Sequence, residues 1–173
     1  MSWIAFFLAV AAAATNPGAA APDSVSGRCR DGRTWTTSLV EQGQMLGLLN
    51  EARASEARPP LRRHAVLDRM ALAQAADMAC RNYFDHTNPE RMKLQDRLKR
   101  ANDGSLAAWH RLAEIIGTSV TPRRQLERWL GSRAHRRAVL EEEHDLVGVG
   151  MVRIQGSRYG TYWAVEFAAE GRY

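Results

Sequence analysis

The last third of the chain contains two apolar segments that predict paired β-strands. Residues 146–154 have the sequence LVGVGMVRI and residues 161–168 have the sequence TYWAVEFA, with the turn-forming stretch QGSRYG between them. Gly148 and Gly150 leave the first strand with little side chain, which predicts close approach of another layer or a narrow cavity beside it. A protein whose helices come first and whose paired strands come last is expected to be α+β, with helices packed on a small sheet.

Apolar residues spaced near 3.6 predict helices ahead of this hairpin. Their expected ranges are 38–58, 65–83, 90–100, 106–116 and 122–131. The first ends before Pro59-Pro60, because proline cannot continue a helix. The second carries many alanines, which permit close packing. Residues 22–37 contain almost nothing apolar before Trp35, so we expect an extended N-terminal arm there.

The first residues predict export. Residues 3–14, WIAFFLAVAAAA, are apolar and uncharged, yet shorter than the ~20 residues that a membrane-spanning helix needs. Small residues at Gly18 and Ala20 fit a cleavage site, so residues 1–21 are a predicted signal peptide. No Lys or Arg precedes the apolar run, which leaves an uncleaved membrane anchor as the alternative. We expect a mature chain without a transmembrane span, located in the periplasm or outside the cell.

The predicted export affects the interpretation of the two cysteines, Cys29 and Cys80. In an oxidising compartment two cysteines most simply form one disulfide, here joining the N-terminal segment to the helix that carries Cys80. The alternative is a reactive thiol, but nothing near either cysteine resembles a Cys-His motif.

The charge of the chain favours anionic partners. Lys and Arg number 24 against 19 for Asp and Glu, a net charge of +5. No zinc-finger, RRM or basic-zipper signature is present, so we expect no nucleic-acid role. Arginines are dense between Arg123 and Arg137, and acidic residues follow at 141–145. We therefore expect a solvated, internally paired surface there; the alternative is contact with an anionic envelope polymer or with lipid headgroups.

Two histidines and one glutamate stand out among the residues that carry chemistry. His86 closes the segment YFDH after the second predicted helix, and His135 lies in WLGSRAHRRAVL. Glu114 lies in LAEII, where an acid costs free energy unless it is paired or lines a solvated cavity. His144 lies in the run EEEHD and is left out, because consecutive residues of a helix point in different directions.

The order of these motifs resembles the CAP superfamily, the SCP-like extracellular proteins, in its bacterial form. The resemblance covers about residues 40–169 and rests on these segments in order: LLNEARA, PPL, the alanine-rich helix from Leu67 to Ala79, YFDH, Asp96-Arg97, LAEIIG, a Trp-x-x-Ser-x-x-His-Arg segment, VGVG and YWAVEFA. It implies one CAP domain at residues 38–170. The implied fold is an α+β three-layer α-β-α sandwich with a C-terminal antiparallel hairpin.

The resemblance also implies a cavity lined by two histidines and two acids. Matched by motif, His86, Glu114 and His135 supply three of these positions, and the fourth falls on Ser132. Ile115 stands where the family usually has asparagine, which puts one polar contact of the cavity in doubt.

Such a triad admits several functions. Two imidazoles and one carboxylate are three ligands, the number that leaves a fourth position on Zn²⁺ open to water or substrate. We expect an exported binding protein with a divalent-metal site formed by His86, His135 and Glu114, its ligand unidentified. The same residues are candidate catalytic residues of a hydrolase acting on peptides or envelope substrates, although no nucleophile is assigned beside them. A structural hydrogen-bonded cluster is the third possibility.

The resemblance adds lipid or sterol carriage as a further function. Expected partners are accordingly a small molecule, a lipid or a cell-envelope component, and we expect a monomer. Fold is implied far more firmly than function, because one fold serves many functions.

Overall fold

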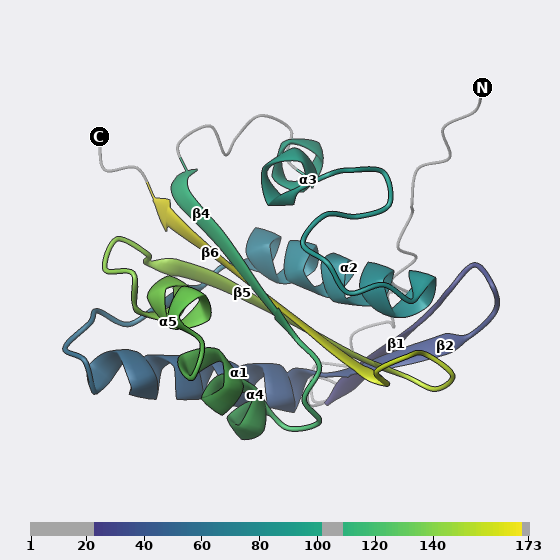
Figure 1. Ribbon diagram of the computed structural model, residues 1–173, viewed down its shortest axis with the longest axis horizontal. Coiled ribbons are helices and arrows are strands. Elements are labelled where there is room, and N and C mark those ends of the chain that lie inside the picture. The colour runs from purple at the N-terminus through teal and green to yellow at the C-terminus, as the bar shows by residue number, and fades with distance from the viewer. Residues whose placement is uncertain (1–22, 102–108, 171–173) are drawn as a thin grey trace, which may run out of the picture.

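The computed structural model describes residues 23–101 and 109–170 (Figure 1). The predicted signal peptide, residues 1–21, lies outside the described residues. The elements are β1 (Ser24–Arg28), β2 (Thr34–Ser38), α1 (Leu39–Ala54), β3 (Arg62–Arg63), α2 (Ala65–Arg81), α3 (Leu94–Ala101), β4 (Trp109–Gly117), α4 (Pro122–Leu130), α5 (Arg133–Leu140), β5 (Leu146–Ile154) and β6 (Thr161–Glu170). No helix within the described residues is long and apolar enough to cross a membrane.

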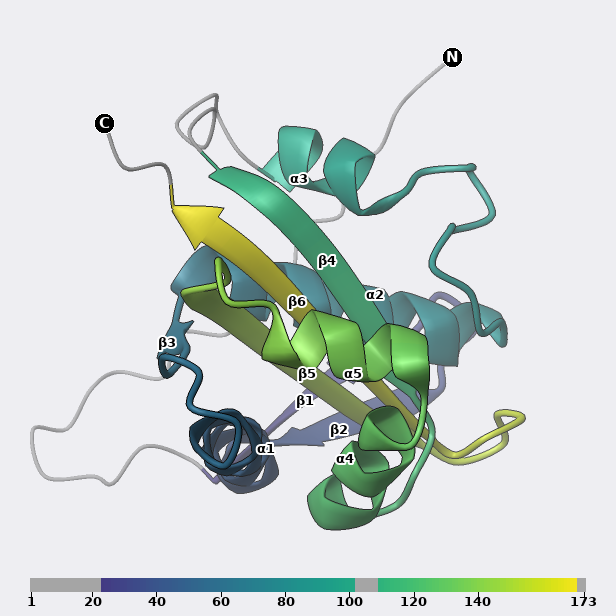
Figure 2. The same ribbon diagram turned by 60° about the vertical axis from the view of Figure 1, so that its left-hand side comes forward.

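A central sheet lies between two helical layers, as the implied three-layer sandwich requires. The strand order is β1-β2-β5-β6-β4, and the short β3 pairs with β5. Apart from the parallel β3–β5 pair, the strands run antiparallel. Helix α2 covers one face, and α1, α4 and α5 cover the other (Figures 1 and 2). β4 therefore ends the sheet on one side.

Strand β5 is buried on both faces because its alternate residues enter two different cores. Val147, Val149 and Met151 join the core that lies under α1, α4 and α5. Gly148 and Gly150 face α2 instead. A Cβ atom at Gly148 would lie 2.0 Å from the backbone of Leu67, and one at Gly150 would lie 2.2 Å from the backbone of Ala71. The close approach predicted from the glycines is thus confirmed, and the approaching layer is α2.

Local sequence explains where the main helices begin and end. Ser38 caps α1, its side chain accepting a hydrogen bond from the backbone of Glu41. Asn82 ends α2 in the left-handed conformation, at φ 57°. Pro122 opens α4 at a position where its missing N–H costs nothing. These boundaries agree closely with the helices expected at 38–58, 65–83 and 122–131.

A buried arginine ties α1 to the opposite end of the helical layer. The guanidinium of Arg53, fully buried, donates hydrogen bonds to the carbonyl oxygens of Pro59, Val139, Glu141 and His144 at 2.7–2.9 Å. It therefore provides hydrogen bonds to backbone carbonyl groups at the end of α5 and before β5 that are not paired within a helix or the sheet.

The structure corrects several expectations. The helix expected at residues 106–116 is wrong for its described part, because residues 109–117 form strand β4, whose Ile115 and Ile116 pair with β6; residues 106–108 lie outside the described residues. Helix α3 begins at Leu94 rather than at residue 90, and α5 was not foreseen. The N-terminal arm is a β-hairpin: β1 and β2 pair from Ser24 to Ser38 and extend the sheet. In the β4 segment, pairing with a neighbouring strand outweighed a helical apolar pattern.

The expected disulfide is confirmed. Cys29 and Cys80 are bonded, with Cα atoms 5.4 Å apart and a sequence separation of 51. The bond joins the β1–β2 hairpin to the last turn of α2, as predicted. The side chain of Arg33 adds a second tie between the same elements by donating to the Cys80 carbonyl oxygen at 2.6 Å.

Candidate functional site

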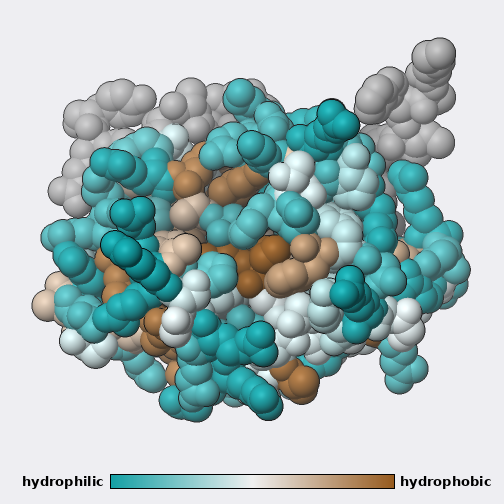
Figure 3. All heavy atoms as spheres, viewed as in Figure 1, coloured by the Kyte–Doolittle hydropathy of each residue, from teal (hydrophilic) through white to brown (hydrophobic). Residues whose placement is uncertain are grey.

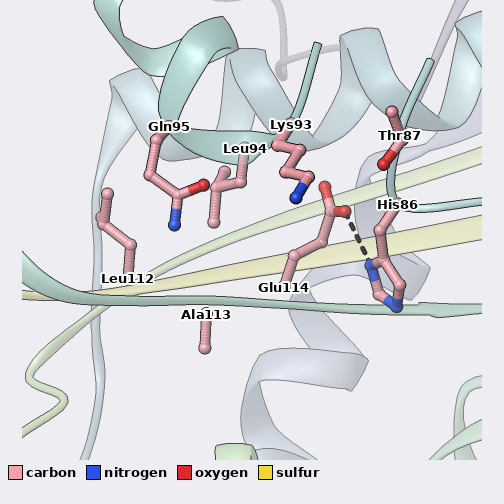
Figure 4. A pocket seen from close by; sticks show the side chains of 8 residues that line it. All are labelled: His86, Thr87, Lys93, Leu94, Gln95, Leu112, Ala113 and Glu114. Atoms are coloured by element: carbon pink, nitrogen blue, oxygen red, sulfur yellow. Dashed lines mark hydrogen bonds and ion pairs between the residues drawn. The ribbon is translucent and has the colours of Figure 1, made fainter. Parts of the chain in front are cut away.

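His86 and Glu114 meet at the β4 edge of the sheet. His86 lies in the loop after α2, and this loop is held by Gln74 of α2, whose amide donates to the carbonyl oxygen of Asp85 at 3.1 Å. Glu114 extends from β4 toward the same loop (Figure 4). Nδ1 of His86 lies 2.9 Å from Oε1 of Glu114, and the side chains are 51% and 3% exposed respectively. A buried carboxylate thus holds a solvent-accessible imidazole.

Arg97 of α3 completes this contact. Its guanidinium donates to Oε2 of Glu114, the carboxylate oxygen that His86 does not use, and also to the backbone carbonyl of His86 at 2.9 Å. Each bond to the carboxylate is charge-assisted, which makes it stronger than a neutral hydrogen bond. Arg97 therefore fixes both the carboxylate and the loop that carries the imidazole. Arg97 stands in the Asp96-Arg97 motif of the sequence, but no local pattern predicts its place in the site.

The contact selects one tautomer of His86. An ionised carboxylate only accepts hydrogen bonds, so Nδ1 carries the hydrogen and donates it to Glu114. In the neutral ring Nε2 is then the unprotonated nitrogen, with its lone pair available to a metal ion or to a proton.

A second glutamate lies behind Glu114. Glu166 of β6 stands opposite Glu114 of β4 in the strand register, and Gly148 of β5 stands on its other side. Glu166 is fully buried, and neither of its carboxylate oxygens has a hydrogen-bond partner among the described residues. Its Oε1 lies 3.7 Å from Arg97. Burial, followed by the neighbouring charge of Glu114, raises the pKa of Glu166 well above its usual range.

The sequence analysis missed Glu166, although a signal was present. Glu166 interrupts the apolar run TYWAVEFA in the same way that Glu114 interrupts LAEII. The argument that singled out Glu114, the cost of an acid in an apolar segment, applies equally to Glu166.

His135 approaches from the opposite helical layer. It lies in α5, which packs beside β4. Burial, with a smaller electrostatic contribution from His86, lowers the pKa of His135. The two predicted histidines are therefore close enough to interact electrostatically.

The two departures from the family pattern lie close by. Ser132 is the N-cap residue of α5, but its side chain makes no capping hydrogen bond. Ile115 points into the core under α1 and α4, away from Glu114. The isoleucine thus adds to the core rather than to the cavity.

A small cavity opens beside His86 and Glu114. Its volume is about 270 Å³, and it is lined by His86, Thr87, Lys93, Leu94, Gln95, Leu112, Ala113 and Glu114 (Figure 4). Leu94 and Leu112 form an apolar side, while Lys93, Gln95 and Thr87 offer hydrogen-bonding groups. Apolar and hydrogen-bonding groups therefore meet in one open hollow beside His86.

The predicted zinc set was a group of three side chains. Across residues 23–101 and 109–170, no three His, Cys, Asp or Glu side chains are grouped so as to hold a metal ion. Both oxygens of Glu114 are already bonded, to His86 and Arg97. Zinc binding therefore stays a prediction, and a direct bond from Glu114 would require one of these contacts to break.

His144, which is not among the predicted site residues, packs in the core. Both of its ring nitrogens lie within hydrogen-bonding distance of backbone carbonyls, those of Ala138 and Arg111, at 3.0 and 2.6 Å. Its ring stacks on Phe167 at a centroid distance of 5.2 Å. Burial lowers its pKa.

Comparison with known proteins agrees with this architecture. The chain is 28% identical over 153 residues to the uncharacterized protein YkwD of Bacillus subtilis, covering 88% of this chain and 51% of YkwD. It is 29% identical over 116 residues to the uncharacterized membrane protein YlbC of the same organism, covering 66% of this chain and 32% of YlbC. The chain therefore spans about half the length, or less, of the curated relatives it matches.

Two solved structures show the same fold. An outer surface protein of Borrelia burgdorferi superposes with a TM-score of 0.68 at 16% identity, covering 76% of this chain and 94% of that one. An extracellular protein of Bacillus anthracis that contains an SCP domain gives a TM-score of 0.64 at 24% identity, covering 82% and 48%. The sequence model of the cysteine-rich secretory protein family matches residues 46–167, more than half of the chain. This protein therefore belongs to the cysteine-rich secretory protein family, the CAP family.

Proposed function

We propose that this protein is an exported CAP-domain binding protein whose ligand is taken at the imidazole of His86. The observation that carries the proposal is the 2.9 Å contact between Nδ1 of His86 and Glu114, which directs an unprotonated Nε2 away from the carboxylate. Export is supported by the Cys29–Cys80 disulfide, because such bonds persist in oxidising compartments. The extracellular character of the Bacillus anthracis relative agrees with it.

A divalent metal such as Zn²⁺ is the ligand that this donor set suits best. Histidines that bind metals usually donate their other ring N–H to a carboxylate, which is the arrangement of His86 and Glu114. His135, whose pKa is lowered by burial, supplies a second imidazole in its neutral form. Glu114 would then act through His86 rather than as a direct ligand of the metal. A bound metal would polarise a carbonyl or phosphoryl group of a second ligand.

The test is a zinc titration by calorimetry on the purified protein. We expect saturable one-to-one binding that is lost in the His86→Ala/His135→Ala variant and weakened about 10- to 100-fold in Glu114→Gln. His110→Ala is the matched control, because His110 is an exposed histidine whose neighbour is Glu143 rather than Glu114. Absence of binding by the folded wild type, or equal loss in His110→Ala, would reject a metal site at His86.

Hydrolysis is the second candidate, and the same contact favours it. A carboxylate that orients an imidazole produces a general base, here Nε2 of His86, able to take a proton from water. If the protein is a hydrolase, turnover of peptide or envelope substrates falls in His86→Ala while the circular dichroism spectrum is unchanged. Unchanged turnover in that variant would exclude His86 as the base. Lipid or sterol carriage stays a prediction.

A further inference from the structure

The arginines of α4 and α5 are not paired as the sequence suggested. Five exposed members, which we call the α4–α5 arginine face, have no carboxylate partner among the described residues; they are Arg123, Arg124, Arg128, Arg133 and Arg137. Within this stretch Arg136 is paired, with Glu56 at 2.6 Å. Hydrophilic side chains gather over both helices in Figure 3.

The acidic run that follows pairs with other parts of the chain. Glu142 binds Arg58 at 2.6 Å, Glu143 binds Arg111 at 2.8 Å, and Asp145 binds Arg62 at 3.0 Å. The expectation of an internally paired surface is thus wrong for the α4–α5 arginine face. Neighbours in sequence are therefore not neighbours in space, because the acids pair with arginines of the segment after α1, of β3 and of β4.

This arrangement costs the fold stability. Arg124 and Arg128 are four residues apart on α4, and Arg133 and Arg137 are four residues apart on α5, so each pair shares one side of its helix. Like charges at this spacing destabilise a helix. No carboxylate of the described residues forms an ion pair with a member of either pair. An anion that binds both members of a pair would remove the repulsion.

Apolar side chains are exposed beside the same face. Val120 immediately precedes the capped start of α4 and is 65% exposed, and Val40 on α1 is 49% exposed. The side chain of Arg153 joins the two segments, because it binds the carboxylate of Glu41 and the carbonyl oxygen of Val120. Val120 and Val40 are therefore exposed on neighbouring segments at the start of α4 and of α1, and a purely electrostatic partner would not use them.

We propose that the α4–α5 arginine face docks on the surface of an anionic phospholipid bilayer. Guanidinium groups bind phosphate oxygens in a planar, two-point manner, which suits lipid headgroups. Val120 and Val40 enter the boundary between headgroups and acyl chains, as the apolar side of an interfacial helix does. The docking surface belongs to α4, α5 and the start of α1; none of its residues lines the cavity at His86, although His135 of the proposed metal site also lies on α5.

Vesicle binding tests the proposal with the full protein. The probes are vesicles of phosphatidylcholine and phosphatidylglycerol in equal parts, and vesicles of phosphatidylcholine alone. The test variant is Arg124→Gln/Arg128→Gln/Arg133→Gln/Arg137→Gln. We expect it to bind the anionic vesicles roughly fivefold more weakly for each charge removed, a few hundred-fold in all. Wild-type binding is expected to weaken as salt is raised.

A matched control removes the same charge from arginines that are already paired. It is Arg58→Gln/Arg62→Gln/Arg111→Gln/Arg136→Gln, and it should retain most of the wild-type binding. Equal losses in the two variants would show that net charge alone matters and would overturn the proposal. Equal wild-type binding to the two kinds of vesicle would overturn it as well.

The valines separate a lipid surface from a soluble polyanion. Val40→Ser/Val120→Ser keeps every charge, and we expect it to weaken vesicle binding several-fold while leaving binding of soluble polyphosphate unchanged. Vesicle binding that is indifferent to these valines, together with polyphosphate binding through the same four arginines, would assign the face to a polymer and reject the bilayer.

Discussion

Glu114 and Glu166 stand directly opposite each other on β4 and β6, with Arg97 as the cation shared between them. Arg97 donates to Glu114 and lies 3.7 Å from Glu166, whose oxygens have no hydrogen-bond partner among the described residues. One guanidinium cannot neutralise two buried carboxylates. Burial and the neighbouring carboxylate of Glu114 therefore favour the protonated form of Glu166 and raise its pKa above the usual range.

The first prediction concerns the pH dependence of stability. Because the folded state raises the pKa of Glu166, it binds a proton more tightly than the unfolded state. The free energy of unfolding should then fall as pH rises from the ordinary pKa of 4.5 to the raised pKa of Glu166, and level off above it. Within this pH range, the free energy of unfolding should fall by about 1.4 kcal/mol for each pH unit.

Glu166→Gln isolates this contribution, because glutamine resembles the protonated acid but does not titrate. In urea unfolding at a series of pH values, the free energy of unfolding of the variant should increase relative to that of the wild type as pH rises through this range. Parallel curves for the two proteins would mean that Glu166 titrates normally.

The second prediction concerns Arg97. Arg97→Met leaves Glu114 without its cation in a buried setting and should cost about 3 kcal/mol of unfolding free energy. Adding Glu114→Gln removes the unpaired charge, so the double variant should be more stable than the sum of the single effects predicts. Arg100→Met, an exposed position on the same helix, should change stability by less than about 0.5 kcal/mol. Strict additivity in this cycle would contradict the assigned contact.

The third prediction concerns the glycines of β5. Alanine at Gly148 or Gly150 would place a Cβ atom 2.0–2.2 Å from the backbone of α2, so the helix must move off the sheet. We expect a loss of about 1–3 kcal/mol or more in chemical unfolding. Gly43→Ala and Gly47→Ala in α1 meet open space instead, and should stabilise the protein by about 0.5–1 kcal/mol each. Similar losses at all four positions would refute the close contact between β5 and α2.

The fourth prediction concerns the disulfide. Cys29→Ser/Cys80→Ser releases a loop with a sequence separation of 51 residues, which should cost about 4 kcal/mol on the chain-entropy estimate. Thermal unfolding with and without a reducing agent should show a large shift for the wild type and none for the variant. If the melting temperature of the wild type does not change with the reducing agent, the disulfide does not contribute to the stability of the fold.

Much of the frame could be predicted because its signals are local. The cap at Ser38 and the proline that opens α4 act within one helical turn, and α1 ends at Ala54, ahead of Pro59 as expected. The glycines of β5 predicted a close layer because only a missing side chain permits that contact. The motif order led to His86 and Glu114, which the fold brings into contact, and to His135, whose place in a common site stays a prediction.

Other features depended on which segments meet in space. β4 was mistaken for a helix because its apolar pattern allows either structure, and only pairing with β6 selects the strand. Glu166 and Arg97 enter the site through strand register and the placement of α3, which no local pattern encodes.

By itself, the sequence determined the main helix boundaries, the C-terminal hairpin, the cysteine pairing and the order of the site motifs. The tertiary structure alone decided which charges are neutralised. The acids at 141–145 turn away from the neighbouring arginines, and one arginine serves two glutamates from different strands. The physical reason is the distance over which each effect acts. Backbone conformation depends mainly on residues within a few positions in the sequence, whereas the interactions of a charge depend on the groups that the fold places within a few ångströms of it.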